Sequence, residues 1–191
     1  MGKVILDMAM SLDGYIASGK NDYIYPIKDI SSTRGLKKLI KKAGAVVMDM
    51  DAYNLANGDF TGYEYQVPVF VVTNKAPVVI AKGENDQLKF TFVENGMRSA
   101  IVKAKTAAGK KNIMVIGLAK AAQRAIRSGK VDEMIIRLIP VILGRGIRLL
   151  DNVGGKTIQM KIAGSKQFGK RIDIRCRFKR KSPTGNFQSF I

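Results

Sequence analysis

Apolar residues follow one another in short runs of strand length, and these runs alternate with segments of helical period. The strand candidates are KVILDMAMS, AVVM, VPVFVVT, FTFV, NIMVIG and EMIIRLIPVIL. Short, continuous apolar strands are typical of a parallel sheet that is buried on both faces. Pro140 interrupts the last run, which predicts a bend or a sheet edge at that position.

Three segments between these runs predict helices. SSTRGLKKLIKKAG begins with Ser/Thr capping candidates, carries Leu36, Leu39, Ile40 and Ala43 on one face, and is expected to end at Gly44. GMRSAIVKAKTAAG and AKAAQRAIRSG each finish in a glycine that is a candidate C-terminal cap. Strands therefore alternate with helices over most of the chain.

The pattern changes to period two toward the C-terminus. The apolar members are Ile158, Met160, Ile162, Ile172, Ile174, Cys176 and Phe178. Their alternation with polar residues predicts an antiparallel hairpin with one buried face, joined through AGSKQFG. Strand–helix alternation closed by such a hairpin predicts a single α/β domain with a mostly parallel central sheet. We expect this domain to span residues 1–180, followed by a basic and aromatic tail over 181–191.

Composition narrows the classes of function. The chain has no histidine, which excludes His-based triads and Cys/His zinc sites, so no metal site is expected. A lone Cys176 cannot form an internal disulfide, and its place in a strand pattern favours core packing. No apolar run is long enough to span a membrane, so the cytoplasm is the expected compartment.

The charge is strongly positive, with 33 Lys and Arg against 15 acids and a formal net charge of +18. Residues 161–181 hold many of the basic side chains and only one acid, Asp173. Such a segment suits a nucleic acid, an anionic small molecule or simply a charged surface, and no nucleic-acid motif accompanies it.

MAMSLDGYIA, residues 8–17, and VDEMIIRLIPVILGRGIRLL, residues 131–150, are two motifs at a defined separation. They resemble the opening strand and loop, and the P-x-x-L-G-x-G turn, of the dihydrofolate-reductase-like family. The resemblance is to the branch that includes the reductase domain of bacterial riboflavin biosynthesis, and it covers roughly residues 3–178. It implies a three-layer α/β fold, hydride transfer from NADPH to a pterin-like or ribosylamino-pyrimidine ring, and a homodimer.

The resemblance also implies roles for residues of the first motif. Ala9 and Ile16 match the positions whose backbone groups hold the nicotinamide carboxamide, although both also suit an ordinary core. Asp13 is either a substrate-side carboxylate with a catalytic role or an Asx-type cap of the turn before Gly14.

Two further segments match the family's cofactor loops. In VTNKAP, Thr73 and Asn74 are hydrogen-bond donors and Lys75 supplies charge for the adenosine ribose and 2′-phosphate, although a polar turn explains the same residues. In VIGLAKAAQ a strand leads into a helix, so the backbone N–H groups of Leu118 and Ala119 are expected to face a pyrophosphate. The family prefers Gly–Gly here.

The second of these loops departs from the family pattern. This chain has Gly117 followed by Leu118, which hinders a close approach of the backbone to a ligand. Just before them, Ile116 stands where the riboflavin-pathway enzymes usually carry a glutamate, so a polar contact to substrate is lost.

The turn MDMDAYN aligns with the family pattern M-G-R-x-T-[YW]-[DE]. Asp49 stands in place of the glycine, Met50 in place of the arginine that pairs with the 2′-phosphate, and Ala52 in place of the threonine. Two unit charges about 4 Å apart interact by roughly 4 kcal/mol at an effective dielectric of 20, so Asp49 and Asp51 oppose a pyrophosphate. Asp51 is also a candidate N-cap for a helix beginning near Tyr53.

Three interpretations of this acidic turn stay open. NADPH binds weakly through Lys75 and the helix start at Leu118, or NADH is preferred because acids accept hydrogen bonds from a ribose 2′-hydroxyl. In the third interpretation the fold has lost redox catalysis.

The leading hypothesis is an NAD(P)H-dependent reductase of the riboflavin-biosynthesis type that acts on a small heterocyclic substrate, with protonation from water or Asp13. Gly144, Arg145 and Gly146 are expected to end a strand beside this cleft, where Arg145 either binds a substrate phosphate or is an exposed turn residue.

Two alternatives accompany this hypothesis. One is a non-catalytic descendant of the fold whose basic hairpin binds nucleic acid or another polyanion. The weaker one is a dihydrofolate reductase, because the first predicted helix lacks an acid and Asp29 before it is the nearest carboxylate.

Overall fold

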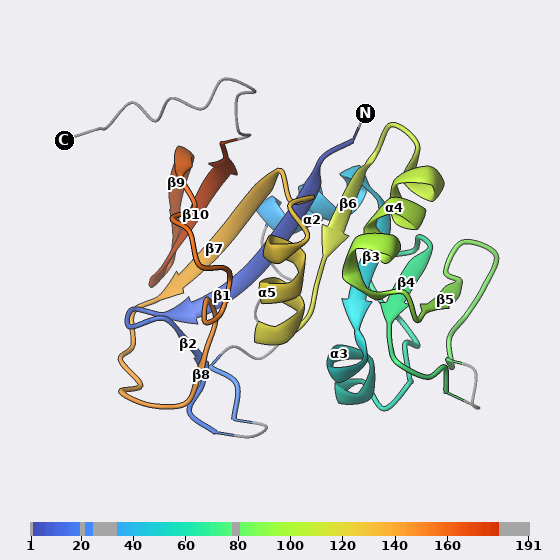
Figure 1. Ribbon diagram of the computed structural model, residues 1–191, viewed down its shortest axis with the longest axis horizontal. Coiled ribbons are helices and arrows are strands. Elements are labelled where there is room, and N and C mark those ends of the chain that lie inside the picture. The colour runs from blue at the N-terminus through green and yellow to red at the C-terminus, as the bar shows by residue number, and fades with distance from the viewer. Residues whose placement is uncertain (1, 20–21, 25–33, 78–80, 180–191) are drawn as a thin grey trace.

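The computed structural model describes residues 2–19, 22–24, 34–77 and 81–179. In this part of the chain, eight strands form the main sheet in the order β5-β4-β3-β6-β1-β7-β10-β9 (Figure 1). Their bounds are β1 Val4–Ser11, β3 Ala43–Asp49, β4 Val69–Val72, β5 Phe90–Val93, β6 Asn112–Val115, β7 Glu133–Ile139, β9 Met160–Phe168 and β10 Arg171–Phe178. The neighbours from β5 to β7 are parallel, whereas β10 is antiparallel to both β7 and β9.

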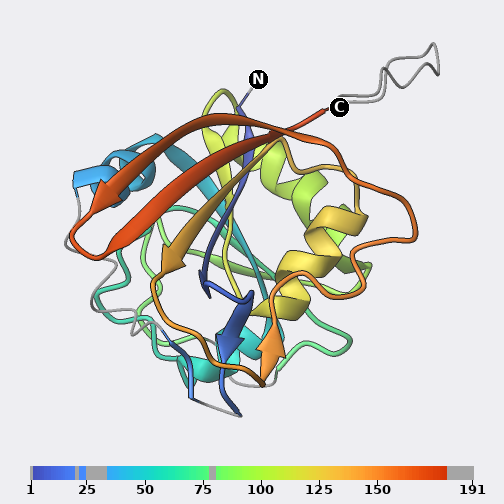
Figure 2. The same ribbon diagram turned by 90° about the vertical axis from the view of Figure 1, so that its left-hand side faces the viewer.

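Helices cover both faces of this sheet, and their bounds are α2 Arg34–Lys42, α3 Met50–Leu55, α4 Gly96–Ala108 and α5 Ala119–Arg127. Helices α4 and α5 pack on one face in a core that includes Leu6 and Val115. Helix α2 lies on the other face, where Leu39 belongs to a second core with Ile5. Figures 1 and 2 show the resulting three layers. The predicted α/β fold with a mostly parallel sheet and a C-terminal hairpin is confirmed.

Helix α2 ends earlier than its sequence suggests. Gly44 was expected to stop the helix, but β3 begins at Ala43 and Gly44 lies inside the strand. A Cβ at position 44 would lie 2.6 Å from the Cβ of Lys111 and 2.9 Å from the carbonyl oxygen of Ala108. Glycine is needed here because the chain passes close to the end of α4, and this contact is distant in sequence.

The C-terminal hairpin forms, but with other bounds than predicted. Strand β9 starts at Met160 and includes most of AGSKQFG, so the connection is the short turn at Gly169 and Lys170. Its apolar face is also not buried as expected, because Ile162 is 67% exposed and Ile172 is 41% exposed. Helices α4 and α5 pack against strands on the other side of β7, so they do not reach β9. Cys176 is buried, as predicted.

A small second sheet, which the sequence pattern did not predict, pairs β2 Tyr15–Ala17 with β8 Ile147–Arg148. The loop before β8 contains Gly144, Arg145 and Gly146, so these residues do not end a strand as expected; β7 stops at Ile139, just before Pro140. A Cβ at Gly146 would lie 1.9 Å from the carbonyl oxygen of Ala17. The loop therefore fits against β2 only with glycine at this position.

A buried guanidinium joins the hairpin to the parallel part of the sheet. Arg137 on β7 donates to both carboxylate oxygens of Asp7 on β1, at 2.9 and 2.6 Å, and to Asp173 on β10 at 3.2 Å. The side chains of Arg137 and Asp7 are 3% and 8% exposed. Arg171 adds a contact to Asp173 at 2.9 Å. Burial alone would lower the pKa of Arg137, but Asp7 and Asp173 more than offset this and the pKa is raised.

Replacing Arg137 by methionine is expected to lower the free energy of unfolding by about 3–5 kcal/mol, because Asp7 and Asp173 would remain buried without a counter-charge. Urea unfolding followed by circular dichroism measures this loss. The matched control is Arg148→Met, since Arg148 is exposed and lies 4.6 Å over the ring of Tyr15. The control should cost less than about 1 kcal/mol. Equal losses in the two variants would contradict the role given to Arg137.

Candidate cofactor and substrate site

The carboxyl ends of the parallel strands meet at one edge of the sheet. Strand β1 ends there at Ser11, β3 at Asp49 and β7 at Ile139, and the loops after β4 and β6 begin at the same edge. In Figure 1 these arrowheads lie toward α3 and the β2–β8 sheet. Ligands of open α/β sheets bind at this edge, and the predicted site residues follow these strand ends.

Ala9 has backbone groups that β6 does not use. The Lys3 carbonyl accepts a hydrogen bond from β6 at 2.8 Å, and alternate residues of a strand direct their amide groups to the same neighbour. Ala9 therefore directs its N–H and C=O toward the β6 side. The pairing of β1 with β6 stops at Leu6, whereas its pairing with β7 continues to Ser11. Ala9 lies in this open edge of β1, as a backbone contact to a carboxamide requires.

Ile16 is placed differently. Its side chain is buried in the core with α4 and α5, and its carbonyl accepts a hydrogen bond from Ile24 N–H at 3.1 Å. Both observations favour the core role that the sequence left open for this residue.

Asp13 joins the two loops that the family motifs identified. Its carboxylate accepts hydrogen bonds from the Ser11 hydroxyl at 2.6 Å, from Gly144 N–H at 2.7 Å and from Leu143 N–H at 3.2 Å. The Ser11 hydroxyl, and then the two amides, lower the pKa of Asp13 from 3.8 to about 2. Asp13 is therefore ionised at neutral pH and holds the loops together. This geometry suits a turn-fixing acceptor better than a proton donor.

Ser11 was missed by the sequence reasoning. It is fully buried, and its hydroxyl also accepts a hydrogen bond from Tyr15 N–H at 2.9 Å. A signal was present in the S-L-D-G turn, since a serine two residues before an aspartate commonly takes part in such local hydrogen bonds.

The loop after β4 is a compact polar turn. The Thr73 hydroxyl donates to the Lys75 carbonyl at 2.7 Å and accepts from Lys75 N–H at 3.1 Å. This turn uses the hydroxyl of Thr73, which is buried, and leaves the side chains of Asn74 and Lys75 exposed at the edge of the sheet. Of the three predicted ligands here, Asn74 and Lys75 are placed to meet a solute.

The acidic turn builds the start of α3. Asp49, not Asp51, is the N-cap of this helix, and its carboxylate accepts from Ala52 N–H at 3.1 Å. Asp51 instead pairs with Lys120 at 3.4 Å. That ion pair links the first turns of α3 and α5 across the edge of the sheet.

The loop after β6 lies directly against Asp49. A Cβ at Gly117 would lie 2.6 Å from the Cβ of Ala121 and 3.2 Å from Oδ1 of Asp49. Leu118 is the N-cap of α5 and gives no side-chain hydrogen bond to the helix, so the first N–H groups of α5 have no side-chain acceptor from it. Gly117 and Leu118 are half-buried and Ala119 is buried. The structure thus brings Asp49 together with the predicted pyrophosphate loop.

Arg145 lies in the exposed loop between β7 and β8, next to Gly144, whose amide binds Asp13. The Asp13 contact therefore fixes the base of the loop that carries this guanidinium. Asp29 lies outside the described residues, as does the tail over 181–191.

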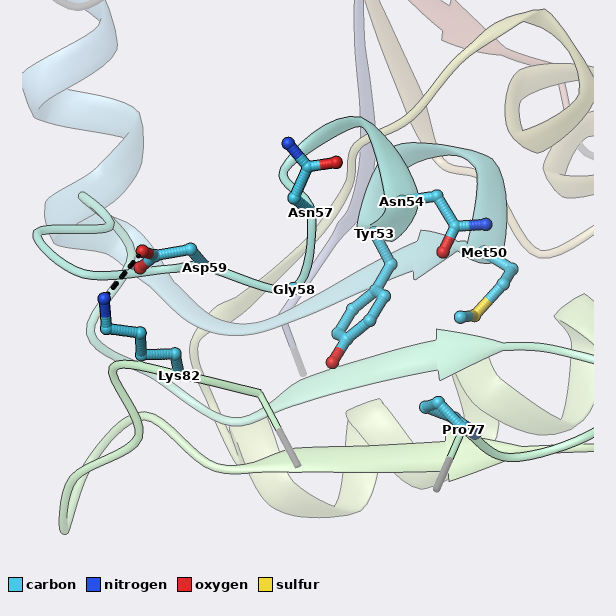
Figure 3. A pocket seen from close by; sticks show the side chains of 8 residues that line it. All are labelled: Met50, Tyr53, Asn54, Asn57, Gly58, Asp59, Pro77 and Lys82. Atoms are coloured by element: carbon cyan, nitrogen blue, oxygen red, sulfur yellow. Dashed lines mark hydrogen bonds and ion pairs between the residues drawn. The ribbon is translucent and has the colours of Figure 1, made fainter. Parts of the chain in front are cut away.

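A cavity of about 760 Å³ lies against α3 (Figure 3). Met50, Tyr53 and Asn54 line it from the helix, and Pro77 and Lys82 from the connection after β4. The rim includes an ion pair between Lys82 and Asp59 at 3.1 Å. Met50 is shared between this cavity and the acidic turn, so the cavity opens beside the predicted adenosine end of the site.

The basic hairpin is partly neutralised by the protein itself. Arg177 and Arg175 lie 2.9 and 4.0 Å from the Glu133 carboxylate, and Arg171 pairs with Asp173. Among the described residues, no cluster of His, Cys, Asp and Glu could hold a metal ion. No helix in the same part of the chain is long and apolar enough to cross a membrane.

The three-layer fold, with its mostly parallel sheet and C-terminal hairpin, is that of a dihydrofolate-reductase-like domain. Residues 2–174 match the model of the RibD C-terminal domain, and the chain belongs to that family. It is 28% identical over 177 residues to the uncharacterized protein YwjB of Bacillus subtilis (strain 168), which covers 90% of this chain and 95% of that protein.

Solved structures agree on the fold. A Shewanella sp. PV-4 protein assigned to riboflavin biosynthesis superposes with a TM-score of 0.73 at 23% identity, covering 93% of this chain and 99% of the other. A second structure is the Thermotoga maritima diaminohydroxyphosphoribosylaminopyrimidine deaminase/5-amino-6-(5-phosphoribosylamino)uracil reductase. It superposes with a TM-score of 0.71 at 13% identity, and the match covers 93% of this chain and 57% of the other. Enterococcus faecalis dihydrofolate reductase, complexed with NADP(H), superposes with a TM-score of 0.64 at 11% identity, and the match covers 94% of this chain and 98% of the other.

Asp13→Ala is expected to speed hydrogen exchange at the Leu143 and Gly144 amides, because both lose their acceptor. The folded-state pKa of Asp13 is lowered, so its contribution to stability is full above about pH 3.8 and disappears as the pH falls through about 2. Exchange measured by NMR between pH 2 and 6 tests both points. The control is Asp59→Ala. The pKa of Asp59 is also lowered to about 2, but this residue binds Thr61 and Lys82, away from the Asp13 loops. Unchanged exchange at the Leu143 and Gly144 amides would show that Asp13 does not hold the two loops together.

Proposed function

We propose that this chain is an NAD(P)H-dependent reductase of the riboflavin-biosynthesis type, acting on a small heterocyclic substrate. The observation that carries the proposal is the open edge of β1 at Ala9, at the same end of the sheet as the start of α5. An extended backbone edge and a helix start suit the carboxamide and pyrophosphate ends of a dinucleotide. Membership of the RibD C-terminal domain family supports the same activity.

The two ends of the site fit the cofactor unequally. At the nicotinamide end, the backbone groups of Ala9 are directed away from β7 and lie beyond the pairing with β6. At the phosphate end, Asp49 and Met50 occupy the positions where the family pattern has glycine and arginine. Lys75, exposed at the edge of the sheet, is a cation that would attract a phosphate there. We therefore propose NADPH as the cofactor, with NADH as the alternative that the acidic turn favours.

The chain's own residues would orient the reactants and pair with their charged groups. A bound NADPH supplies a hydride. Ala9 would hold the carboxamide through its backbone, and Arg145, exposed on the loop that Asp13 fixes, would pair with a substrate phosphate. Because hydrogen bonds keep Asp13 ionised at neutral pH, the proton that accompanies the hydride comes from water.

A ribosylamino-pyrimidine is the proposed substrate class, in line with the reductase of Thermotoga maritima that shares the fold. Ile116, which is half-buried, gives no polar contact where the riboflavin-pathway enzymes usually have a glutamate. Dihydrofolate remains the weaker alternative, since helix α2 contains no acid.

Calorimetric titration with NADPH and NADH at two salt concentrations tests the proposal. NADPH is expected to bind in the micromolar range, more weakly at high salt, because exposed cations provide the phosphate contacts. Lys75→Ala should weaken NADPH binding by up to about fivefold, which corresponds to about 1 kcal/mol for an exposed ion pair. Consumption of NADPH with a ribosylamino-pyrimidine, and not with dihydrofolate, would complete the assignment.

The matched control is Lys103→Ala, because Lys103 is also an exposed lysine and lies in the middle of α4. It should leave the affinity unchanged. If neither nucleotide binds at millimolar concentration, the reductase proposal is wrong. A preference for NADH would instead give the acidic turn a ribose-binding role.

The homodimer remains a prediction, as does binding of the hairpin to a polyanion. Glu133 and Asp173 already pair with Arg171, Arg175 and Arg177, which lowers the positive potential of the hairpin. For the dimer, the exposed side chains of Ile142 and Ile162 are the first place to look for an interface.

A further inference from the structure

Asp49 is a buried carboxylate with an incomplete set of partners. It is 2% exposed, and its Oδ1 accepts from Ala52 N–H at 3.1 Å. In the part of the chain that the structure describes, its Oδ2 is buried without a hydrogen-bond partner. A buried carboxylate normally has its oxygens satisfied, so an orphan oxygen beside a ligand edge calls for a chemical explanation.

The surroundings of Asp49 are those of an anion site. The carboxylate lies against Gly117, where a Cβ would approach Oδ1 to 3.2 Å, and the turn at Gly117 leads directly into α5. Helix α5 has no side-chain cap at Leu118, so its first N–H groups, at the positive end of the helix dipole, have no acceptor from that side chain. An anion bound at this helix start would therefore meet the Asp49 carboxyl group.

We propose that Asp49 is a proton-controlled gate at the start of α5, which admits the pyrophosphate of a nucleotide only when its carboxyl group is protonated. The ionised form repels a phosphate, whereas the neutral form presents an O–H that donates a hydrogen bond to it. Binding would then take up one proton from solution. The inference rests on the proposed function, because it concerns the phosphate end of the same cofactor site.

The charged groups around Asp49 are compatible with such a gate. Burial, and then Asp51, raise the pKa of Asp49, while the Ala52 amide and Arg124 on α5 lower it, with a net upward shift. Lys120 on α5 pairs with Asp51 and is 70% exposed, so its charge is directed to the surface. Asp49 therefore takes up its proton at a higher pH than an ordinary aspartate does.

Titration of the full chain with NAD⁺ between pH 5.5 and 8 tests the gate, because the pyrophosphate diester of NAD⁺ does not itself titrate there. Wild-type affinity is expected to fall by up to about tenfold per pH unit above the pKa of Asp49. Calorimetry in buffers of different ionisation enthalpy should show uptake of up to one proton. Adenosine, which carries no phosphate, should bind without this pH dependence.

Asp49→Asn is the decisive variant, since asparagine keeps the N-cap acceptor of α3 and removes the charge. It should bind NAD⁺ at least about tenfold more tightly than wild type at pH 8, without pH dependence. Asp51→Asn removes a neighbouring charge and should keep the wild-type slope. Asp49→Gly also removes the charge, so its affinity for NAD⁺ should likewise not depend on pH.

The outcomes separate this inference from the proposed function. Wild-type binding of NADPH and NAD⁺ with no pH dependence overturns the gate and leaves the reductase proposal standing. Binding by Asp49→Asn at pH 8, and by wild type only toward pH 5.5, supports the gate. Binding by Asp49→Asn alone at every pH tested overturns both the gate and the reductase proposal. Equal affinities in wild type and Asp49→Asn at pH 8, or a slope that persists in the variant, overturn the gate.

The unfolding free energy gives an independent readout. The folded-state pKa of Asp49 is raised, so its neutral form stabilises the fold at low pH and this contribution is lost as the pH rises above 3.8. Wild type should therefore lose stability relative to Asp49→Asn between pH 4 and 8. A constant difference over this range would show that Asp49 does not titrate there, and the gate would be wrong.

Discussion

The ion pairs of Arg137 hold the two parts of the main sheet in register. Strands β1, β7 and β10 run side by side, and on one face each contributes a charged side chain to the same buried cluster. Desolvating these groups is costly, so the cluster is tolerated only while all its members are present. The antiparallel hairpin can thus dock on β7 in only one register, since a slip by one residue would turn Asp173 to the other face.

The same pairing determines the shape of the site. Because β7 supports β1 as far as Ser11, β1 continues beyond the end of its pairing with β6 and keeps one edge open. Asp13 then fixes the following loop to the turn after β7. The edge at Ala9 and the loop that carries Arg145 are therefore set by neighbouring strands rather than by local sequence, and the ligand would meet a preorganised surface.

Features that depend on local pattern were predictable from the sequence. Continuous apolar runs gave the parallel strands, and the S-L-D-G and P-x-x-L-G-x-G motifs identified the family. Features that depend on distant contacts were not: Gly44 adjoins Lys111, Asp49 rather than Asp51 caps α3, and Ile162 is exposed on β9, the last strand of the described sheet. Among the predicted site residues, Ala9 lies on the open edge of β1 and Asp49 lies against the loop after β6. The Thr73 hydroxyl bonds within its own turn, and the Ile16 side chain packs in the core.

Strand β9 ends the main sheet in the described part of the chain, and its outer backbone groups form a template for another strand. Exposed apolar residues such as Ile162 would make such an edge prone to pair with the edge strand of another copy, which leads to aggregation. Lys161 and Lys166 lie exposed on this strand and would repel their counterparts on an incoming copy. Within the described residues, the positive charge of β9 therefore opposes pairing of this long edge strand with the same strand of another copy.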